Sequence, residues 1–145
     1  MASTTATGSS PSFIVSLLRA PWAYHAGAII LTYMYWLSGF TKLFNFSETL
    51  GEMSHFGLNP PAVFAVATII VQLGGSALVI LGNRWAWLGA GALIVFTLAT
   101  IPLAHRFWEM DGPMAMLEML MVQEHITVVG GLILAAVLAE VRRTR

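Results

Sequence analysis

Several stretches of this chain carry no charged side chain over a length that could cross a lipid bilayer. Asp, Glu, Lys and Arg are all absent from residues 20–41, 53–83 and 85–105, and also from the shorter stretch 125–139. A helix needs about 20 mostly apolar residues to cross the hydrocarbon core, because each residue adds about 1.5 Å. In lipid the backbone groups of such a stretch must bond within the segment, which favours helices. The sequence therefore predicts an all-α integral membrane protein.

The expected architecture is an antiparallel four-helix bundle within one transmembrane domain, residues 21–141. Its spans are predicted at about 22–44, 60–82, 85–105 and 117–140. Two short amphipathic helices are expected on the membrane surface, one at 13–20 and one at Ser47–Phe56 with Ser47 as its N-cap. Pro102 is expected to bend the end of the third span.

The two ends of the chain have different compositions. Residues 1–12 are small and polar, which predicts a disordered tail, whereas residues 142–145 form a basic tail. In a four-span arrangement most basic residues fall on the side of the termini: Arg19, Arg84, Arg142, Arg143 and Arg145. Only Lys42 and Arg106 fall on the other side. Basic residues favour the cytoplasm, so both termini are predicted to be cytoplasmic.

Composition excludes several classes of function. Charged residues make up 10% of the chain and hydrophobic residues 57%, and the formal net charge is zero. A chain without excess positive charge is a poor partner for nucleic acid. Cysteine is absent, so the chain has no thiol for disulfide exchange. The partners to expect are lipids, a redox protein or a second copy of the chain.

Polar side chains within the predicted spans suggest a ligand pocket in the outer half of the bundle. The candidates are Tyr35, Ser38, Lys42, Gln72, His105, Trp108, Glu124 and His125. Lys42 would be the cation of this pocket and Glu124 its anion. The alternative is structural: Lys42 extends to the headgroups, Glu124 lies in water, and Gln72 only ties two helices together. No catalytic constellation can be recognised in the sequence.

The four histidines raise the question of a metal or haem. His25 lies at the inner end of the first span, and His55, His105 and His125 fall on the outer side. None of them has the spacing that places two ligands on one helical face. No metal site is therefore predicted, although a single outer haem or metal, assisted by Glu109, Glu118 or Glu124, remains an alternative.

Two further patterns concern surfaces. Methionines cluster between the third and fourth spans: Met110, Met114, Met116, Met119 and Met121. Flexible thioethers suit a lipid-like ligand such as a quinone, although such a cluster can also simply fill space. Small residues predict close helix packing: Gly74 and Gly75 on the second span, Gly89 and Gly91 on the third, and the series Gly131, Ala135 and Ala139 on the fourth.

Taken together, these segments resemble the DoxX family. The resemblance rests on Gly-Phe-Thr-Lys-Leu at 39–43, Phe-Gly-Leu-Asn-Pro at 56–60, Gln-Leu-Gly-Gly at 72–75 followed by Gly82, His-Arg-Phe-Trp at 105–108, and Gly130-Gly131. It implies a four-helix protein of the bacterial inner membrane. Gln72 stands where relatives frequently carry glutamate, and Glu124-His125 replaces a common Lys-Asn pair.

Two classes of function follow from the resemblance. The family takes its name from subunits of a thiosulfate:quinone oxidoreductase, which implies a membrane subunit or accessory of a quinone-linked oxidoreductase system. Such a subunit would hold no electron carrier of its own and would bind the quinone through Lys42, Gln72 and His105. The alternative is a non-enzymatic small-molecule carrier, tolerance factor or membrane assembly protein.

Overall fold

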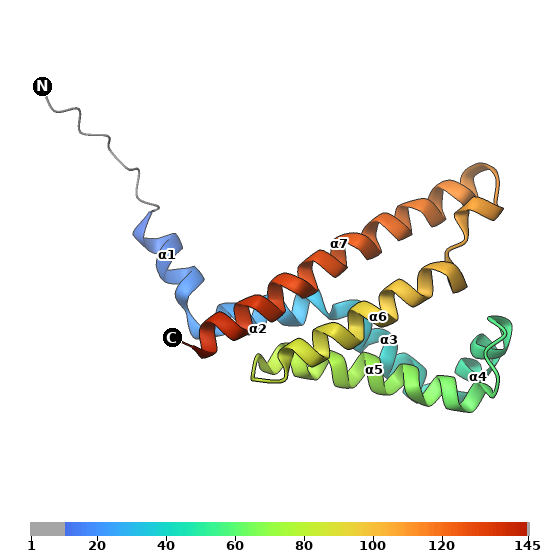
Figure 1. Ribbon diagram of the computed structural model, residues 1–145, viewed down its shortest axis with the longest axis horizontal. Coiled ribbons are helices and arrows are strands. Elements are labelled where there is room, and N and C mark those ends of the chain that lie inside the picture. Colours follow the sequence, from blue (N-terminus) through green and yellow to red (C-terminus); the bar gives the residue numbers. More distant parts are fainter. Residues whose placement is uncertain (1–10, 145) are drawn as a thin grey trace, which may run out of the picture.

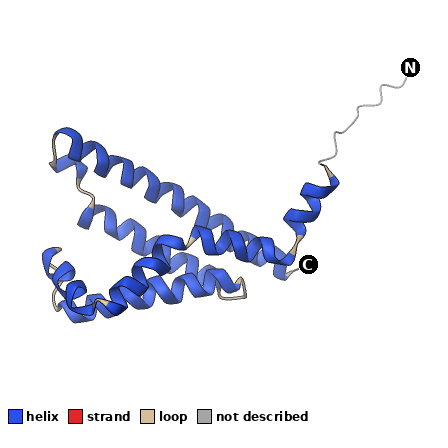
Figure 2. Cartoon of the chain, turned by 180° about the vertical axis from the view of Figure 1, so that it is seen from behind, coloured by secondary structure: helices blue, strands red, loops and turns tan. Residues whose placement is uncertain are grey.

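The structure, a computed structural model, describes residues 11–144. Within that range all regular structure is helical, without a strand (Figure 2), so the all-α prediction is confirmed. The helices are α1 (Ser12–Arg19), α2 (Pro21–Leu31), α3 (Tyr33–Phe44), α4 (Phe46–His55), α5 (Pro61–Leu81), α6 (Ala86–Ala104), the short 3₁₀ helix η1 (Phe107–Glu109) and α7 (Gly112–Arg143). Residues 1–10 of the tail predicted at 1–12, and Arg145 of the basic tail, lie outside the described range.

Three of the described helical segments are long and apolar enough to cross a membrane. They are α5, the segment Ala86–Glu109 that contains α6 and η1, and α7. A fourth crossing is reached if α1 and α2, which meet at an angle of 69°, count as one bent span. The later three spans therefore coincide with long apolar helices, and α7 begins earlier, at Gly112, than the predicted span.

The segment predicted as the first span, residues 22–44, is divided into two helices at Thr32. The buried Thr32 hydroxyl donates a 2.7 Å hydrogen bond to the Ala28 carbonyl oxygen. The backbone at Thr32 leaves the helical region, with φ −92° and ψ 8°. A threonine hydroxyl that competes for backbone acceptors in this way bends or interrupts helices. The expectation of one continuous helix over this range was therefore wrong.

Helix α4 lies where the second surface helix was expected, but its start differs. The N-cap is Asn45, and the helix begins at Phe46 without a side-chain cap hydrogen bond, so the assignment of Ser47 as N-cap was wrong. The buried Thr49 donates 3.1 Å hydrogen bonds to the carbonyl oxygens of Lys42 and Asn45. These bonds hold the first turns of α4 against the end of α3.

Helix α5 is the central element of the packing. It contacts α2, α3, α4 and α6, whereas α7 packs on α6 and α2 (Figure 1). The closest approach of α5 and α6 is at Gly75 and Gly89, where a Cβ added to Gly89 would lie 2.6 Å from the Gly75 carbonyl oxygen. Glycine is required there, as expected for helices that pack through small residues.

The arrangement has two ends with different contents. The start of α2, the α5–α6 turn and the end of α7 lie together at one end, which we call the terminal end (Figure 1). Helix α4, η1 and the start of α7 lie at the other, which we call the loop end (Figure 1). Most of α7 is exposed within the chain, because only its inner stripe contacts α6 and α2.

Candidate functional site

Three of the polar candidates lie in the interior of the bundle and bond to one another or to neighbours. The amide nitrogen of Gln72 on α5 donates a 3.2 Å hydrogen bond to the Ser38 hydroxyl on α3. One turn away on α3, the Tyr35 hydroxyl is hydrogen-bonded to the Thr97 hydroxyl of α6. Thr97 also donates to the Leu93 carbonyl oxygen at 2.7 Å. These contacts tie α3 to both α5 and α6.

Two buried polar atoms in this interior have no hydrogen-bond partner among the described residues. They are Oε1 of Gln72 and the hydroxyl oxygen of Ser76, whose side chains are 4% and 1% exposed. Residues four apart on a helix share a face, so both atoms belong to one polar strip of α5. An unsatisfied buried polar group costs about 1–3 kcal/mol, which makes this strip a candidate for contact with a polar ligand.

Lys42 pairs with a different acid from the one expected. Its ammonium group forms a salt bridge with Glu52 of α4, and its side chain is only 15% exposed. Glu124, the expected anion, is exposed on α7. The two cannot readily converge because α3 packs on α5 while α7 packs on α6.

The clearest convergence of ionisable groups is at the loop end, between the end of α6 and the first half of α7. His105 Nδ1 lies 2.7 Å from Glu118 Oε2, and both side chains are mostly buried. The rings of His105 and His125 are 4.7 Å apart between centroids and inclined by 67°. His125 Nδ1–H donates to the Met121 carbonyl oxygen at 2.7 Å. We call His105, Glu118 and His125 the histidine cluster.

Both rings of the histidine cluster are oriented through the same nitrogen. Because Glu118 holds Nδ1 of His105 and a backbone carbonyl holds Nδ1 of His125, Nε2 is the remaining hydrogen-bonding atom of each ring. A carboxylate that orients an imidazole is a common arrangement for moving a proton at the other nitrogen. In a neutral ring this Nε2 accepts a hydrogen bond, and in a protonated ring it donates one, so the cluster can bind a hydroxyl or a carbonyl oxygen and exchange a proton with it.

Exposed methionines occur on the same part of α7 as Glu118 and His125. Met114 and Met116, at the start of α7, are each 60% exposed, and Met119 and Met121 are also exposed. Trp108, the remaining candidate, is 54% exposed on η1 and packs edge-to-face on Phe107. Spacing by four and seven residues places Met114 and Met121 on the helical face of Glu118 and His125, where flexible thioethers suit an apolar ligand.

The structure therefore groups the eight candidates into separate contacts. Tyr35, Ser38 and Gln72 lie in the interior, Lys42 lies at the α3–α4 junction, and His105 and His125 lie together in the histidine cluster. Trp108 and Glu124 are exposed. None of the eight lines either of two shallow apolar grooves on the helix surfaces.

Sequence reasoning left Glu52 and Ser76 out of the candidate set and considered Glu118 only as an aid to a metal. Glu118 and His125 are seven residues apart, and that spacing places them on one face of a helix. This signal was available in the sequence. Within residues 11–144, no group of three or more His, Asp or Glu side chains is arranged to hold a metal ion.

Comparison with known proteins gives the family. The DoxX family model matches residues 25–106, more than half of the chain. The chain belongs to the DoxX family. The matched DoxX region contains α3, α5, α6 and His105, and it ends before Glu118 and His125. The resemblance seen in the motifs is thereby confirmed, and with it a membrane protein with helical spans.

A curated relative supports the same assignment. The inner membrane protein YphA of Escherichia coli (strain K12) is 26% identical over 110 residues, which cover 76% of this DoxX chain and 76% of the relative. No solved structure matches the chain significantly.

Proposed function

We propose that this DoxX protein is the membrane-embedded component of a quinone-linked oxidoreductase system and binds the quinone headgroup at the histidine cluster. The observation that carries the proposal is the contact of His105 with both Glu118 and His125 beside exposed methionines. A quinone has two ring oxygens that accept hydrogen bonds and an isoprenoid tail that belongs in lipid. A protonated imidazole of the cluster would donate Nε2–H to a ring oxygen, and the exposed methionines of the same part of α7 would suit the tail.

Proton chemistry supports the same site. Reduction of a quinone adds two electrons and two protons, one proton to each ring oxygen. The histidine cluster would bind the ring and supply or receive protons, while the electrons would come from a partner protein. An imidazole oriented by a carboxylate suits that task near neutral pH. In this proposal Lys42 and Gln72 hold the bundle together and do not contact the ring, which differs from the expectation drawn from the sequence.

The proposal also includes location and orientation. The relative is named an inner membrane protein, and a bacterial inner membrane is proposed for this chain as well. Arg19, Arg84 and Arg142 lie at the terminal end, so both termini are proposed to be cytoplasmic. The histidine cluster would then face the opposite side of the membrane. Reporter fusions to each terminus test this orientation, and a non-cytoplasmic signal at either terminus would contradict it.

The direct test is quinone binding by the purified protein in mild detergent. A short-chain benzoquinone is titrated while tryptophan fluorescence is recorded, since Trp108 lies on η1 close to the cluster in sequence. His105→Phe and Glu118→Gln should each weaken binding about tenfold or more, because a hydrogen bond to a charged or oriented group contributes about 1.5–3 kcal/mol. His55→Phe, at an exposed histidine that packs on Phe56, is the matched control.

The outcomes separate clearly. Weaker binding in the two cluster variants with a normal His55→Phe variant supports the proposal. Equal binding in all variants, or no quinone binding by the unaltered protein, would contradict it. Affinity purification followed by mass spectrometry and redox difference spectra then tests the partner, since an associated flavin, haem or iron–sulfur protein is expected.

A second candidate, a non-enzymatic carrier or tolerance factor for small molecules, is favoured by a different observation. Gln72 Oε1 and the Ser76 hydroxyl are buried without partners among the described residues, and a small polar molecule passing through the bundle would satisfy them. In that case Gln72→Leu should abolish transport or tolerance while His105→Phe leaves it intact. Loss of function in His105→Phe but not in Gln72→Leu supports the histidine cluster as the functional site.

A further inference from the structure

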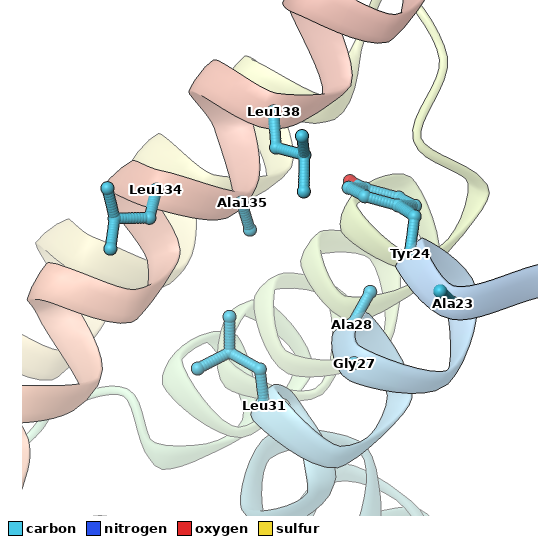
Figure 3. A pocket seen from close by; sticks show the side chains of 8 residues that line it. All are labelled: Ala23, Tyr24, Gly27, Ala28, Leu31, Leu134, Ala135 and Leu138. Atoms are coloured by element: carbon cyan, nitrogen blue, oxygen red, sulfur yellow. The ribbon is translucent and has the colours of Figure 1, made fainter. Parts of the chain in front are cut away.

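A shallow apolar groove lies between α2 and α7 at the terminal end, remote from the histidine cluster (Figure 3). Its volume is about 170 Å³, and its walls come from most of the length of α2 and the last third of α7. The lining residues are Ala23, Tyr24, Gly27, Ala28, Leu31, Leu134, Ala135 and Leu138. Small residues on both helices leave a channel between larger side chains, which suits a narrow hydrocarbon chain.

A cation lies against one of the side chains that line the groove. The Arg142 guanidinium lies 4.7 Å from the centre of the Tyr24 ring, and Tyr24 is one of the lining residues. One guanidinium nitrogen donates a 3.1 Å hydrogen bond to the Pro21 carbonyl oxygen. That bond holds the group in place and leaves other N–H donors of Arg142 for a ligand, because arginine has five.

The surroundings of Arg142 are positive and aromatic. Arg19 ends α1, Arg84 lies in the α5–α6 turn, and both belong to the terminal end (Figure 1). Two hydrogen bonds join the Arg143 guanidinium to the Glu140 carboxylate, at 2.5 and 3.0 Å, and they raise the pKa of Arg143. The negative charge of Glu140 is thereby neutralised. Trp22, 58% exposed beside the groove, is a typical residue of the headgroup level.

We propose that this groove is a binding site for an anionic phospholipid, with one acyl chain between α2 and α7 and the phosphate on Arg142. Charge complementarity selects this occupant: an apolar channel opens onto a basic end that holds one acid and four arginines among the described residues. Guanidinium groups bind phosphate through paired hydrogen bonds, and basic residues near a bilayer surface favour anionic lipids. The site does not depend on the proposed quinone function.

The structure offers a variant that fills the groove. Gly27 lines it, and a Cβ added there meets no atom within 4 Å. Gly27→Leu should therefore occupy the acyl-chain position without displacing the backbone. Gly91→Leu is the matched control, because Gly91 is equally open and lines a separate apolar groove between α5 and α6. Both variants replace a helical glycine with leucine, so their intrinsic effects on the helix are similar.

Native mass spectrometry of delipidated protein provides the measurement, with phosphatidylglycerol and phosphatidylcholine of identical acyl chains as probes. We expect phosphatidylglycerol to bind more tightly. Arg142→Gln should remove most of this preference, about a fivefold change for one basic residue near the surface. Gly27→Leu should lower bound lipid at the tightest site at least as much, whereas Gly91→Leu should leave it unchanged.

Two results would overturn the proposal. One is equal binding of the two lipids by the unaltered protein, which would remove the role of charge. The other is undiminished phosphatidylglycerol binding in both Arg142→Gln and Gly27→Leu. If Gly27→Leu does not fold, Arg142→Gln decides alone, because it leaves the groove intact. Quinone titration of the same variants should be normal, so a failure of the lipid proposal is distinguishable from a failure of the quinone proposal.

Discussion

The terminal end and the loop end of the bundle are held by different kinds of contact. At the terminal end, two side chains of α2 bond to the last turns of α5: the Tyr24 hydroxyl donates to the Val79 carbonyl oxygen at 2.8 Å, and His25 Nδ1–H donates to that of Ile80 at 2.7 Å. At the loop end, the contacts are pairs of ionisable side chains, such as His105 with Glu118. The first kind fixes helices, whereas the second can be opened by a proton or a ligand.

This difference indicates that the terminal end and the loop end have different roles. Both bonds end on a backbone carbonyl oxygen, an acceptor that does not titrate, so the terminal end should be the more rigid part of the fold. Pairs of partly exposed ionisable groups contribute little stability but respond to their surroundings. The loop end is therefore the better place for binding and proton transfer. Four substitutions test this difference in roles, ordered from the largest expected effect to the smallest.

Gly89→Leu should have the largest effect on stability, because the new side chain would disrupt the contact between α5 and α6. The new Cβ would meet the Gly75 backbone, which cannot move without separating the helices. We expect a loss of about 3 kcal/mol or more of stability, or no folded protein. Thermal unfolding in detergent, followed by size-exclusion chromatography, measures this. Gly91→Leu is the control, and equal melting temperatures for the two variants would contradict the close packing.

Tyr24→Phe should have an intermediate effect. The substitution keeps the buried ring but removes its hydrogen bond to the Val79 carbonyl oxygen, which keeps only the backbone N–H of Gly82 at 3.1 Å. Hydrogen bonds between membrane helices contribute about 0.6 kcal/mol on average and up to about 1.7 kcal/mol. Tyr33→Phe, at a tyrosine that is 47% exposed, should change the melting temperature less. If the exposed tyrosine proved the more sensitive of the two, the terminal end would not be the more rigid part.

Glu118→Gln should change stability by less than about 1 kcal/mol, although it should weaken quinone binding strongly. The pair it breaks keeps partial exposure at the loop end, and ion pairs that water can reach contribute little. The same thermal assay measures the effect. A loss as large as that of Tyr24→Phe, without a loss of binding, would show that the histidine cluster has a structural role instead.

Gln72→Leu should have the smallest effect on stability. The informative result is whether the free energy of unfolding rises or falls. Gln72 makes one hydrogen bond to Ser38, and its Oε1 has no partner among the described residues. The substitution removes the cost of burying the unpaired Oε1 but also removes the hydrogen bond to Ser38, so the two effects on stability oppose each other. An increase in melting temperature with reduced function would indicate that the amide is kept for a ligand. The usual net contribution of a hydrogen bond to stability is about 1 kcal/mol. A larger decrease in the free energy of unfolding would indicate that Gln72 chiefly holds α3 to α5.

Much of the fold could be predicted from the sequence because long apolar stretches without charge have few alternatives in lipid. Helices α5 and α6 lie where the second and third spans were expected, within the predicted bounds. The division of the first span at Thr32 could not be predicted, because the side-chain bond of this threonine does not set it apart. Thr97 donates to the carbonyl oxygen four residues back in the same way and lies inside the unbroken α6.

The candidate site could be predicted only in part, because side-chain pairing depends on which helices are neighbours. The sequence placed Lys42 and Glu124 on the same side of the membrane, but helical periodicity does not state that α3 packs on α5 and α7 on α6. Glu52 becomes the partner of Lys42 because α4 folds back beside the end of α3. His105 and His125 did come together, since a short connection joins α6 and α7.

The length of α7 sets where the histidine cluster sits relative to water. At about 1.5 Å per residue, its 32 residues extend for about 48 Å, whereas the hydrocarbon layer is about 30 Å thick. Even at a tilt of about 40°, the upper end of the range for transmembrane helices, α7 still extends about 37 Å along the bilayer normal. At least one turn of the helix must therefore rise into the headgroup zone. If the turn outside the hydrocarbon layer is at the amino-terminal end of α7, the imidazoles of His105 and His125 lie where they can exchange protons with water and also contact a quinone ring dissolved in the lipid.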